Sequence, residues 1–266
     1  GFSQASRQDA RIVSRSVLPP GVHSVRLHAE PIQSNTASRG TFLAMRLLTG
    51  ADGVTGSLGE RLAALGYSED QCRLMASLAG SRGLTLLAGP TGHGKSTTLR
   101  HVMASMVISR PDQSYLSVED PPEYPMAGVR QIQVPTSGGD RASAYADAIA
   151  GAMRCDPDVI MIGEIRWPAA AAAALDAALT GHAVWTTVHA ADAFAIARRL
   201  TGMLTSAGVP DPRETLFGQG VCAGLICQRL MSLNCPRCSL PLSSLTGEAR
   251  RSLLPEELEE FLAGAI

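Results

Sequence analysis

Short apolar runs alternate with helix-like segments over most of this chain, and the alternation predicts an α/β fold. Residues 84–88 form an apolar run with the length of a buried strand, residues 158–164 predict an apolar strand that ends in a carboxylate, and a third strand is predicted within residues 180–189. Residues 169–178, between the last two strands, are almost pure alanine and predict a stable helix. We therefore expect a mostly parallel sheet with helices on both faces.

The first part of the chain has a different pattern. Residues 25–30 alternate between apolar and polar side chains, residues 41–48 are mostly apolar, and both segments predict strands. Residues 31–40 are rich in Ser, Asn and Thr and predict a hairpin loop. We interpret residues 1–48 as the C-terminal part of a small β-rich, PAS-like α+β domain. The chain starts without methionine, so we expect either a fragment of a longer protein or a start altered by cloning.

A glycine-rich segment separates this part from the rest. Residues 49–59 carry glycines at positions 50, 53, 56 and 59, which predicts a flexible linker. A second domain is expected over residues 60–266, and it includes a C-terminal helical region with a C-P-x-C sequence.

Composition and charge narrow the possible functions. The chain has 23 basic and 24 acidic residues, so no overall charge draws it to nucleic acid or to an anionic membrane. We find neither an apolar run of about 18 residues nor a secretory signal. We interpret four scattered cysteines as small apolar residues of a reduced, cytoplasmic protein. They are Cys72, Cys155, Cys222 and Cys227.

Residues 89–96 carry the pattern G-x-x-x-x-G-K-S between a predicted strand and a predicted helix. Glycines let backbone N–H groups turn inward onto a phosphate, and the helix N-terminus adds partial positive charge. Lys95 has the reach for the β- and γ-phosphates, and the Ser96 hydroxyl suits Mg²⁺. The strand and helix on either side disfavour a chance glycine turn, so we predict ATP as the ligand. The predicted nucleotide-binding residues of this loop are Gly89, Pro90, Thr91, Gly92, His93, Gly94, Lys95, Ser96 and Thr97.

Two acidic positions accompany the loop. Glu164 ends the predicted strand 158–164, as a Walker-B carboxylate does, and would lie near Mg²⁺ or its waters. Residues 117–124 hold three carboxylates next to two prolines, a stiff setting for a base that orients water. The alternatives, an exposed acid at a strand end and an acidic surface loop, stay open at this point.

Two histidines flank the strand predicted within residues 180–189. A histidine at a strand end has the chemistry to contact a phosphate, although a single histidine is more often structural. Their placement at both ends of one strand favours a functional role for His182 and His189 only modestly.

Together these segments resemble the secretion ATPases of type II secretion, type IV pilus and conjugative thin-pilus systems. The family's boxes are GPTGSGKSTTL, IEDPVEY, DPDVIMIGEIR and TGHLVxSTLHTNDA. Their counterparts here, in the same order, are residues 89–99, 118–124, 154–166 and 180–193. The resemblance, closest to the assembly branch, extends from about residue 8 to 242 and implies a RecA-like ATPase domain.

The resemblance also implies residue roles. Glu123 corresponds to the base that activates water, with Glu119 and Asp120 supporting it, and Glu164 to the Walker-B carboxylate. His182 and His189 belong to the His box. Arg26 and Arg46 correspond to two arginines that reach the nucleotide phosphates from the amino-terminal domain, although the pattern alone would make both of them surface residues.

The implied protein is a homohexameric, Mg²⁺-dependent ATPase at the cytoplasmic face of a bacterial inner membrane. It would power assembly of a type IV pilus or secretion pseudopilus, with a membrane platform protein and pilin machinery as partners and no direct nucleic acid. A retraction motor, a nucleic-acid translocase of related fold and a non-enzymatic regulator are the alternatives. Near-neutral charge and the low aromatic content, 4%, disfavour the translocase.

The chain departs from the family pattern at three places. His93 replaces a Ser of the phosphate loop, residues 167–169 replace an acidic stretch, and residues 190–191 replace Thr-Asn. Cys235 and Cys238 match one half of the four-cysteine zinc site of the assembly branch, and two cysteines by themselves do not establish Zn²⁺ binding.

Overall fold

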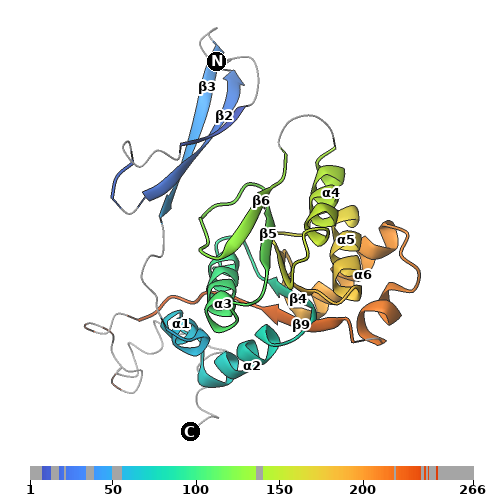
Figure 1. Cartoon of the computed structure of the whole chain (residues 1–266). Coiled ribbons are helices and arrows are strands. Elements are labelled where there is room, and N and C mark those ends of the chain that lie inside the picture. Colours follow the sequence, from blue (N-terminus) through green and yellow to red (C-terminus); the bar gives the residue numbers. More distant parts are fainter. Residues whose placement is uncertain are drawn as a thin grey trace. The chain divides into compact units, whose positions relative to one another are not determined.

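The structure is a computed structural model that describes residues 8–12, 18–20, 22–33, 39–49, 56–135, 140–218 and 220–234, with residues 237, 239 and 244. The chain divides into two compact units, residues 1–229 and 230–266. All helices and strands named below belong to the first unit (Figure 1). A further division of this unit at the glycine-rich segment remains a prediction.

An antiparallel sheet opens the chain. Its strands β1 (Gln8–Ile12), β2 (Val22–Gln33) and β3 (Arg39–Thr49) pair in the order β1-β2-β3. Strands β2 and β3 are longer than the sequence predicts, so both ends of the expected hairpin loop are strand and only residues 34–38, outside the described part, separate them. Arg26 pairs directly with Arg46 across β2 and β3, which places both residues on the same face of the sheet.

The second sheet is built from alternating strands and helices. The elements in chain order are α1 (Leu58–Ala64), α2 (Glu69–Ala79), β4 (Gly83–Ala88), α3 (Lys95–Ser109), β5 (Tyr115–Glu119), β6 (Val129–Gln133), α4 (Arg141–Met153), β7 (Val159–Ile162), α5 (Pro168–Leu179), β8 (Ala183–Val188), α6 (Ala193–Ser206), the π-helix η1 (Glu214–Gly218) and β9 (Cys222–Cys227). Six strands form one sheet in the order β6-β5-β7-β8-β4-β9. Every strand pair recorded in it is parallel, which confirms the predicted α/β class.

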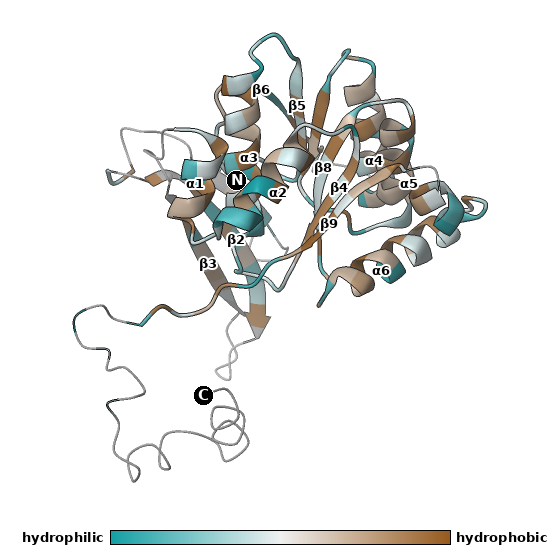
Figure 2. Cartoon of the chain, turned by 90° about the horizontal axis from the view of Figure 1, so that it is seen from below, coloured by the Kyte–Doolittle hydropathy of each residue, from teal (hydrophilic) through white to brown (hydrophobic). Residues whose placement is uncertain are grey.

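Alternating side chains of the central strands enter two separate cores. In β7, Ile160 and Ile162 pack with α4, α5 and α6, whereas Val159 and Met161 face α1, α2 and α3. Because both faces are covered, the central strands β4 and β7 are buried at every position rather than on alternate residues. Figure 2 shows hydrophobic residues along β9 and hydrophilic residues on α1 and α2.

Helix termini explain where two of the helices begin. The Ser57 hydroxyl accepts the Glu60 N–H and the Glu60 carboxylate accepts the Ser57 N–H, a reciprocal cap that starts α1 inside the segment predicted as linker. Helix α5 starts with Pro168 at its first turn, where the missing N–H costs nothing. Its buried alanines, among them Ala170 and Ala174, allow close packing against α4 and α6.

Candidate functional site

The predicted chemistry gathers at one edge of the parallel sheet. Because β4, β5, β7 and β8 run in the same direction, the segments that follow them meet at their carboxyl ends. A cavity of about 530 Å³ lies there. The sequence-predicted residues that line it are Thr91, Gly92, Gly94, Lys95, Ser96, Thr97, Glu119, Asp120, Glu123, Glu164, His189, Arg26 and Arg46. The loop residues Gly89, Pro90 and His93 are not part of this lining.

The phosphate loop joins β4 directly to α3. Gly94 has φ of +78°, a left-handed conformation that favours glycine, immediately before the first helical residue, Lys95. The Lys95 ammonium donates to the Gly89 and Pro90 carbonyls at 2.8 and 3.0 Å and is 8% exposed. Burial lowers the pKa of Lys95, and the nearby Glu164 carboxylate opposes that shift. The loop thus holds a cation and the open amino end of a 15-residue helix at the cavity.

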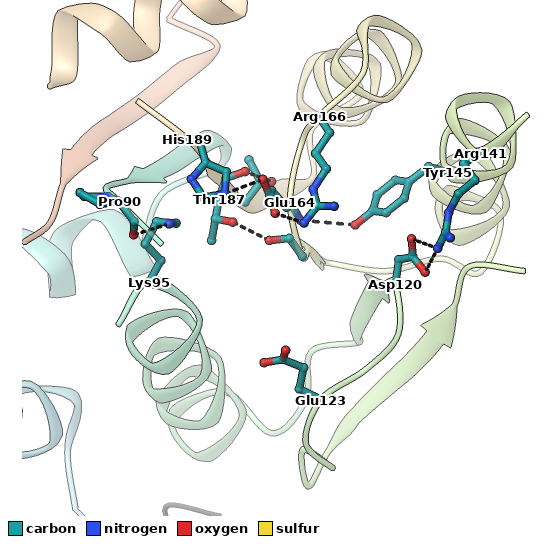
Figure 3. A network of polar contacts seen from close by, with 12 residues as sticks. Pro90, Lys95, Asp120, Glu123, Arg141, Tyr145, Glu164, Arg166, Thr187 and His189 are labelled. Carbon is teal, nitrogen blue, oxygen red and sulfur yellow. Dashed lines mark hydrogen bonds and ion pairs between the residues drawn. The ribbon is translucent and has the colours of Figure 1, made fainter. Parts of the chain in front are cut away.

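Glu164 lies between two basic side chains (Figure 3). One carboxylate oxygen is 2.7 Å from Arg166 Nη2, and the other is 3.1 Å from His189 Nε2. The Glu164 carboxylate raises the pKa of Arg166 through this hydrogen bond. His189 follows β8 and Glu164 follows the neighbouring β7, so the contact depends on the pairing of these strands. The carboxylate is held in place at the cavity wall.

A tyrosine that the sequence did not identify supports this turn. Tyr145 Oη donates to the Val118 carbonyl at 3.2 Å and accepts the Glu164 N–H at 3.3 Å. Its ring, 3% exposed, packs on Trp167 with ring centroids 5.7 Å apart. Burial raises the pKa of Tyr145 to about 12, so the phenol keeps its proton at working pH. One side chain of α4 therefore ties the end of β5 to the backbone of Glu164.

The acidic turn after β5 contains three carboxylates with different surroundings. Glu119 accepts hydrogen bonds from Ser117 Oγ at 2.7 Å and Gln131 Nε2 at 2.9 Å. Asp120 forms an ion pair with Arg141. The Glu123 side chain is 35% exposed and lies apart from the Glu164 network, as Figure 3 shows.

The two amino-terminal arginines also line this cavity. Arg46 Nη1 lies 3.9 Å from Glu123 Oε1. Like charges directly opposite one another on paired strands are destabilising, so an anionic group nearby would stabilise the Arg26–Arg46 pair.

The structure does not bring His182 to the cavity. It precedes β8, at the amino end of that strand, whereas the phosphate loop follows the carboxyl end of the parallel β4. His182 Nδ1 contacts the Ala177 carbonyl at 2.8 Å and Thr180 Oγ1 at 3.0 Å, near the C-terminus of α5. The strand β8 separates the two histidines, so His182 is not among the residues that line the cavity, and its nucleotide contact stays a prediction. His189, at the other end, does line the cavity.

The residues that sequence reasoning missed act through tertiary contacts. Tyr145, Gln131 and Arg141 contact the site but belong to a helix or strand without a motif of its own. The one available sign is that Tyr145 shares a helix face with the buried Ile149, four residues later.

The described residues give no support for the predicted zinc site. Cys235 and Cys238 lie outside the described residues. Within the described part of the chain, no three His, Cys, Asp or Glu side chains form a cluster able to hold a metal ion. Among the same residues, no helix combines the length and apolarity needed to cross a membrane.

Comparisons with known proteins give a consistent result. The "Type II secretion system protein E" of Pectobacterium carotovorum is 34% identical over 228 residues, which are 85% of this chain and 42% of that protein. The "Type IV pilus assembly ATPase PilB" of Thermus thermophilus is 37% identical over 174 residues, 65% of this chain and 18% of that protein. The chain thus spans less than half the length of these relatives.

Solved structures agree with these relatives. The pilus retraction motor PilT with bound ADP superposes with a TM-score of 0.61 at 25% identity, over 96% of this chain and 69% of that one. The Legionella pneumophila ATPase DotB gives a TM-score of 0.58 at 25% identity, over 76% of this chain and 52% of that one. The family model described as "Type II/IV secretion system protein" matches residues 9–259. With a match over nearly its whole length and a phosphate loop at the carboxyl edge of a parallel sheet, the chain belongs to the type II/IV secretion system protein family.

Proposed function

We propose that this chain hydrolyses ATP and is the motor part of a homohexameric ATPase that assembles a type IV pilus or a secretion pseudopilus. The observation that carries the proposal is the convergence of Lys95, Glu164, Glu123 and His189 on one cavity from four separate strand ends. A nucleoside triphosphate fits there, because loop amides, a helix N-terminus and Lys95 supply the positive potential that phosphates require.

The residues present also fit Mg²⁺. Ser96 and Glu164 line the same cavity and present oxygen donors, the ligands that Mg²⁺ prefers. We propose that the Ser96 hydroxyl binds the ion and that Glu164 reaches it through water. The ion would neutralise charge on the phosphates.

The chain's own residues would perform the remaining steps. Glu123 takes a proton from water, the water oxygen bonds to the γ-phosphorus, and the bond to the β-phosphate oxygen breaks to leave ADP and phosphate. We assign this role to Glu123 because it corresponds to the family's base and because its side chain, 35% exposed, lines the cavity. Arg26 and Arg46 would stabilise the charge that develops in the transition state.

Two tests examine hydrolysis directly. Lys95→Ala should abolish ATP binding, and Glu123→Gln should keep binding while phosphate release falls by roughly 10²-fold or more. Asp176→Asn, an exposed change on α5, is the matched control. If Glu123→Gln hydrolyses normally and Glu119→Gln does not, the base is Glu119. If Lys95→Ala hydrolyses ATP at the parent rate, the whole proposal is wrong.

A second test needs no substitution. Lys95 is the only lysine in the sequence, so an amine-reactive reagent can modify its side chain and, besides it, only the chain's amino terminus. ATP bound in the loop should protect Lys95 from the reagent and leave the amino terminus reactive. Mass spectrometry of the peptide that contains Lys95 and of the amino-terminal peptide measures modification at both sites in one sample.

The relatives support the proposed biological role. The matched sequences include a type II secretion protein and a pilus assembly ATPase, which supports assembly, whereas one similar structure is a retraction motor. We propose a cytoplasmic location at the bacterial inner membrane, a membrane platform protein and pilin or pseudopilin machinery as partners, and no direct nucleic-acid contact. Measuring ATPase activity with and without DNA tests the translocase alternative, which predicts stimulation by DNA.

A further inference from the structure

Gln228, one residue past β9, contacts the phosphate loop from outside the four sequence boxes. Its backbone N–H donates to the carbonyl of Ala88, the last residue of β4, at 2.8 Å. Gly89 has φ of +152°, and a Cβ there would lie 2.2 Å from the Gln228 carbonyl oxygen. The start of the loop is therefore packed against the backbone of Gln228, with no room for a side chain.

The side-chain amide of Gln228 bonds to three other segments. Its Oε1 accepts from Tyr67 Oη at 2.7 Å and Thr98 Oγ1 at 2.9 Å, and its Nε2 donates to the His93 carbonyl at 2.7 Å. The two hydroxyl donors decide which way the amide faces, because the opposite orientation would set Oε1 against the His93 oxygen. Either hydroxyl by itself is enough to set this orientation, and the Gln228 N–H then faces the loop.

The His93 carbonyl and the Gly94 N–H belong to one planar peptide unit. In a trans peptide these two groups point in opposite directions, so holding the carbonyl on the Gln228 side turns the Gly94 N–H to the other side. Gly94 lines the cavity, and inward-facing amides of such a loop bind phosphate. Glycine rotates easily, so this peptide depends on an outside contact for its orientation.

We propose that Gln228 is a positioning residue for the phosphate loop: its amide orients the His93–Gly94 peptide so that the Gly94 N–H faces a bound phosphate. The inference rests on the proposed function, since it requires a nucleotide in the loop. It adds a residue that directly follows β9 to the machinery that binds ATP.

Two substitutions at this position separate positioning from packing. Gln228→Glu can still accept from Tyr67 and Thr98 but has no N–H for His93. Gln228→Leu has a similar size and no charge, and it leaves Tyr67 and Thr98 able to bond to each other at 3.0 Å. Tyr67→Phe removes one contact to Gln228 and keeps the bond to His93. Gln133→Ala, an exposed change on β6, is the matched control.

The measurements are the dissociation constant for MgADP by titration calorimetry and the melting temperature without nucleotide, on the full chain. We expect Gln228→Leu to weaken MgADP binding roughly 3- to 10-fold, the scale of one lost hydrogen bond, and Gln228→Glu to weaken it at least as much. Tyr67→Phe should lower the melting temperature but keep MgADP affinity within about twofold of the parent, like Gln133→Ala.

The outcomes are distinguishable. If both Gln228 variants bind MgADP like the parent, or if Tyr67→Phe weakens binding as much as Gln228→Leu does, Gln228 is only a packing residue and the inference is overturned. If the parent itself binds no MgADP, the proposed function falls and the inference falls with it. Loss in both Gln228 variants, with the other two unchanged, supports the assignment.

Discussion

Removing the hydroxyl of Tyr145 tests whether α4 holds the Walker-B turn in place. Tyr145→Phe keeps the ring that packs on Trp167 and removes only the oxygen that bridges Val118 and Glu164. The Val118 carbonyl keeps a second partner, the Gly163 N–H at 2.9 Å. The Glu164 N–H loses the partner described here, so the cost falls mainly on this amide.

The expected loss of stability follows from this one lost hydrogen bond. One partly buried amide without its acceptor costs about 1–2 kcal/mol of the free energy of unfolding, the lower part of the range for such groups. In a domain of this size that loss lowers the melting temperature by roughly 2–8 °C. Because the amide belongs to Glu164 itself, the Glu164 carboxylate is also held less firmly in position, and kcat should fall by roughly three- to tenfold.

The assay pairs thermal unfolding with steady-state ATP hydrolysis. Tyr115→Phe is the matched control, because Tyr115 Oη also makes two main-chain contacts, to the carbonyls of Met106 and Arg110. Tyr115 begins β5, at the opposite edge of the sheet. The control should lower the melting temperature and leave kcat at the parent value. If Tyr145→Phe melts and hydrolyses like the parent, or if both variants lose kcat equally, the positioning argument for Tyr145 is refuted.

Two further predictions concern charge. Arg26→Ala and Arg46→Ala should each lower kcat more than they raise KM, because the charge that these arginines meet develops in the transition state. The control Arg213→Ala, at an exposed position, should change turnover less than about twofold. Parent-like rates in both Arg26→Ala and Arg46→Ala would contradict the proposed role. Burial, together with the nearby Arg100 and Arg61, lowers the pKa of His101 in the folded chain below 6.5. The unfolded chain therefore binds the proton at a higher pH than the folded chain does. As a result, the free energy of unfolding falls as pH drops below about 6.5. Urea unfolding between pH 7 and 5 should show a smaller loss in His101→Leu than in the parent, and equal losses would refute this account.

The sequence by itself determined the features that depend on neighbouring residues. The phosphate loop was predictable because glycine conformations, the helix N-terminus and the reach of Lys95 are local properties of residues 89–96. The apolar runs predicted β4, β7 and β8, and the alanine-rich segment predicted α5 to within one residue at each end. The family boxes assigned these segments to one family, and the family match confirms that assignment.

Tertiary structure alone decided which side chains meet. Tyr145 and Gln228 are far in sequence from the groups they hold, so no local pattern distinguishes them from ordinary core or surface residues. The parallel strand order separates His182 from His189 by the length of β8, although the sequence presents them as a pair. The pairing of β2 with β3 sets Arg26 beside Arg46, which no periodicity of either strand could specify. Contacts of this kind depend on strand order and register, which the whole chain sets when it buries its apolar surface.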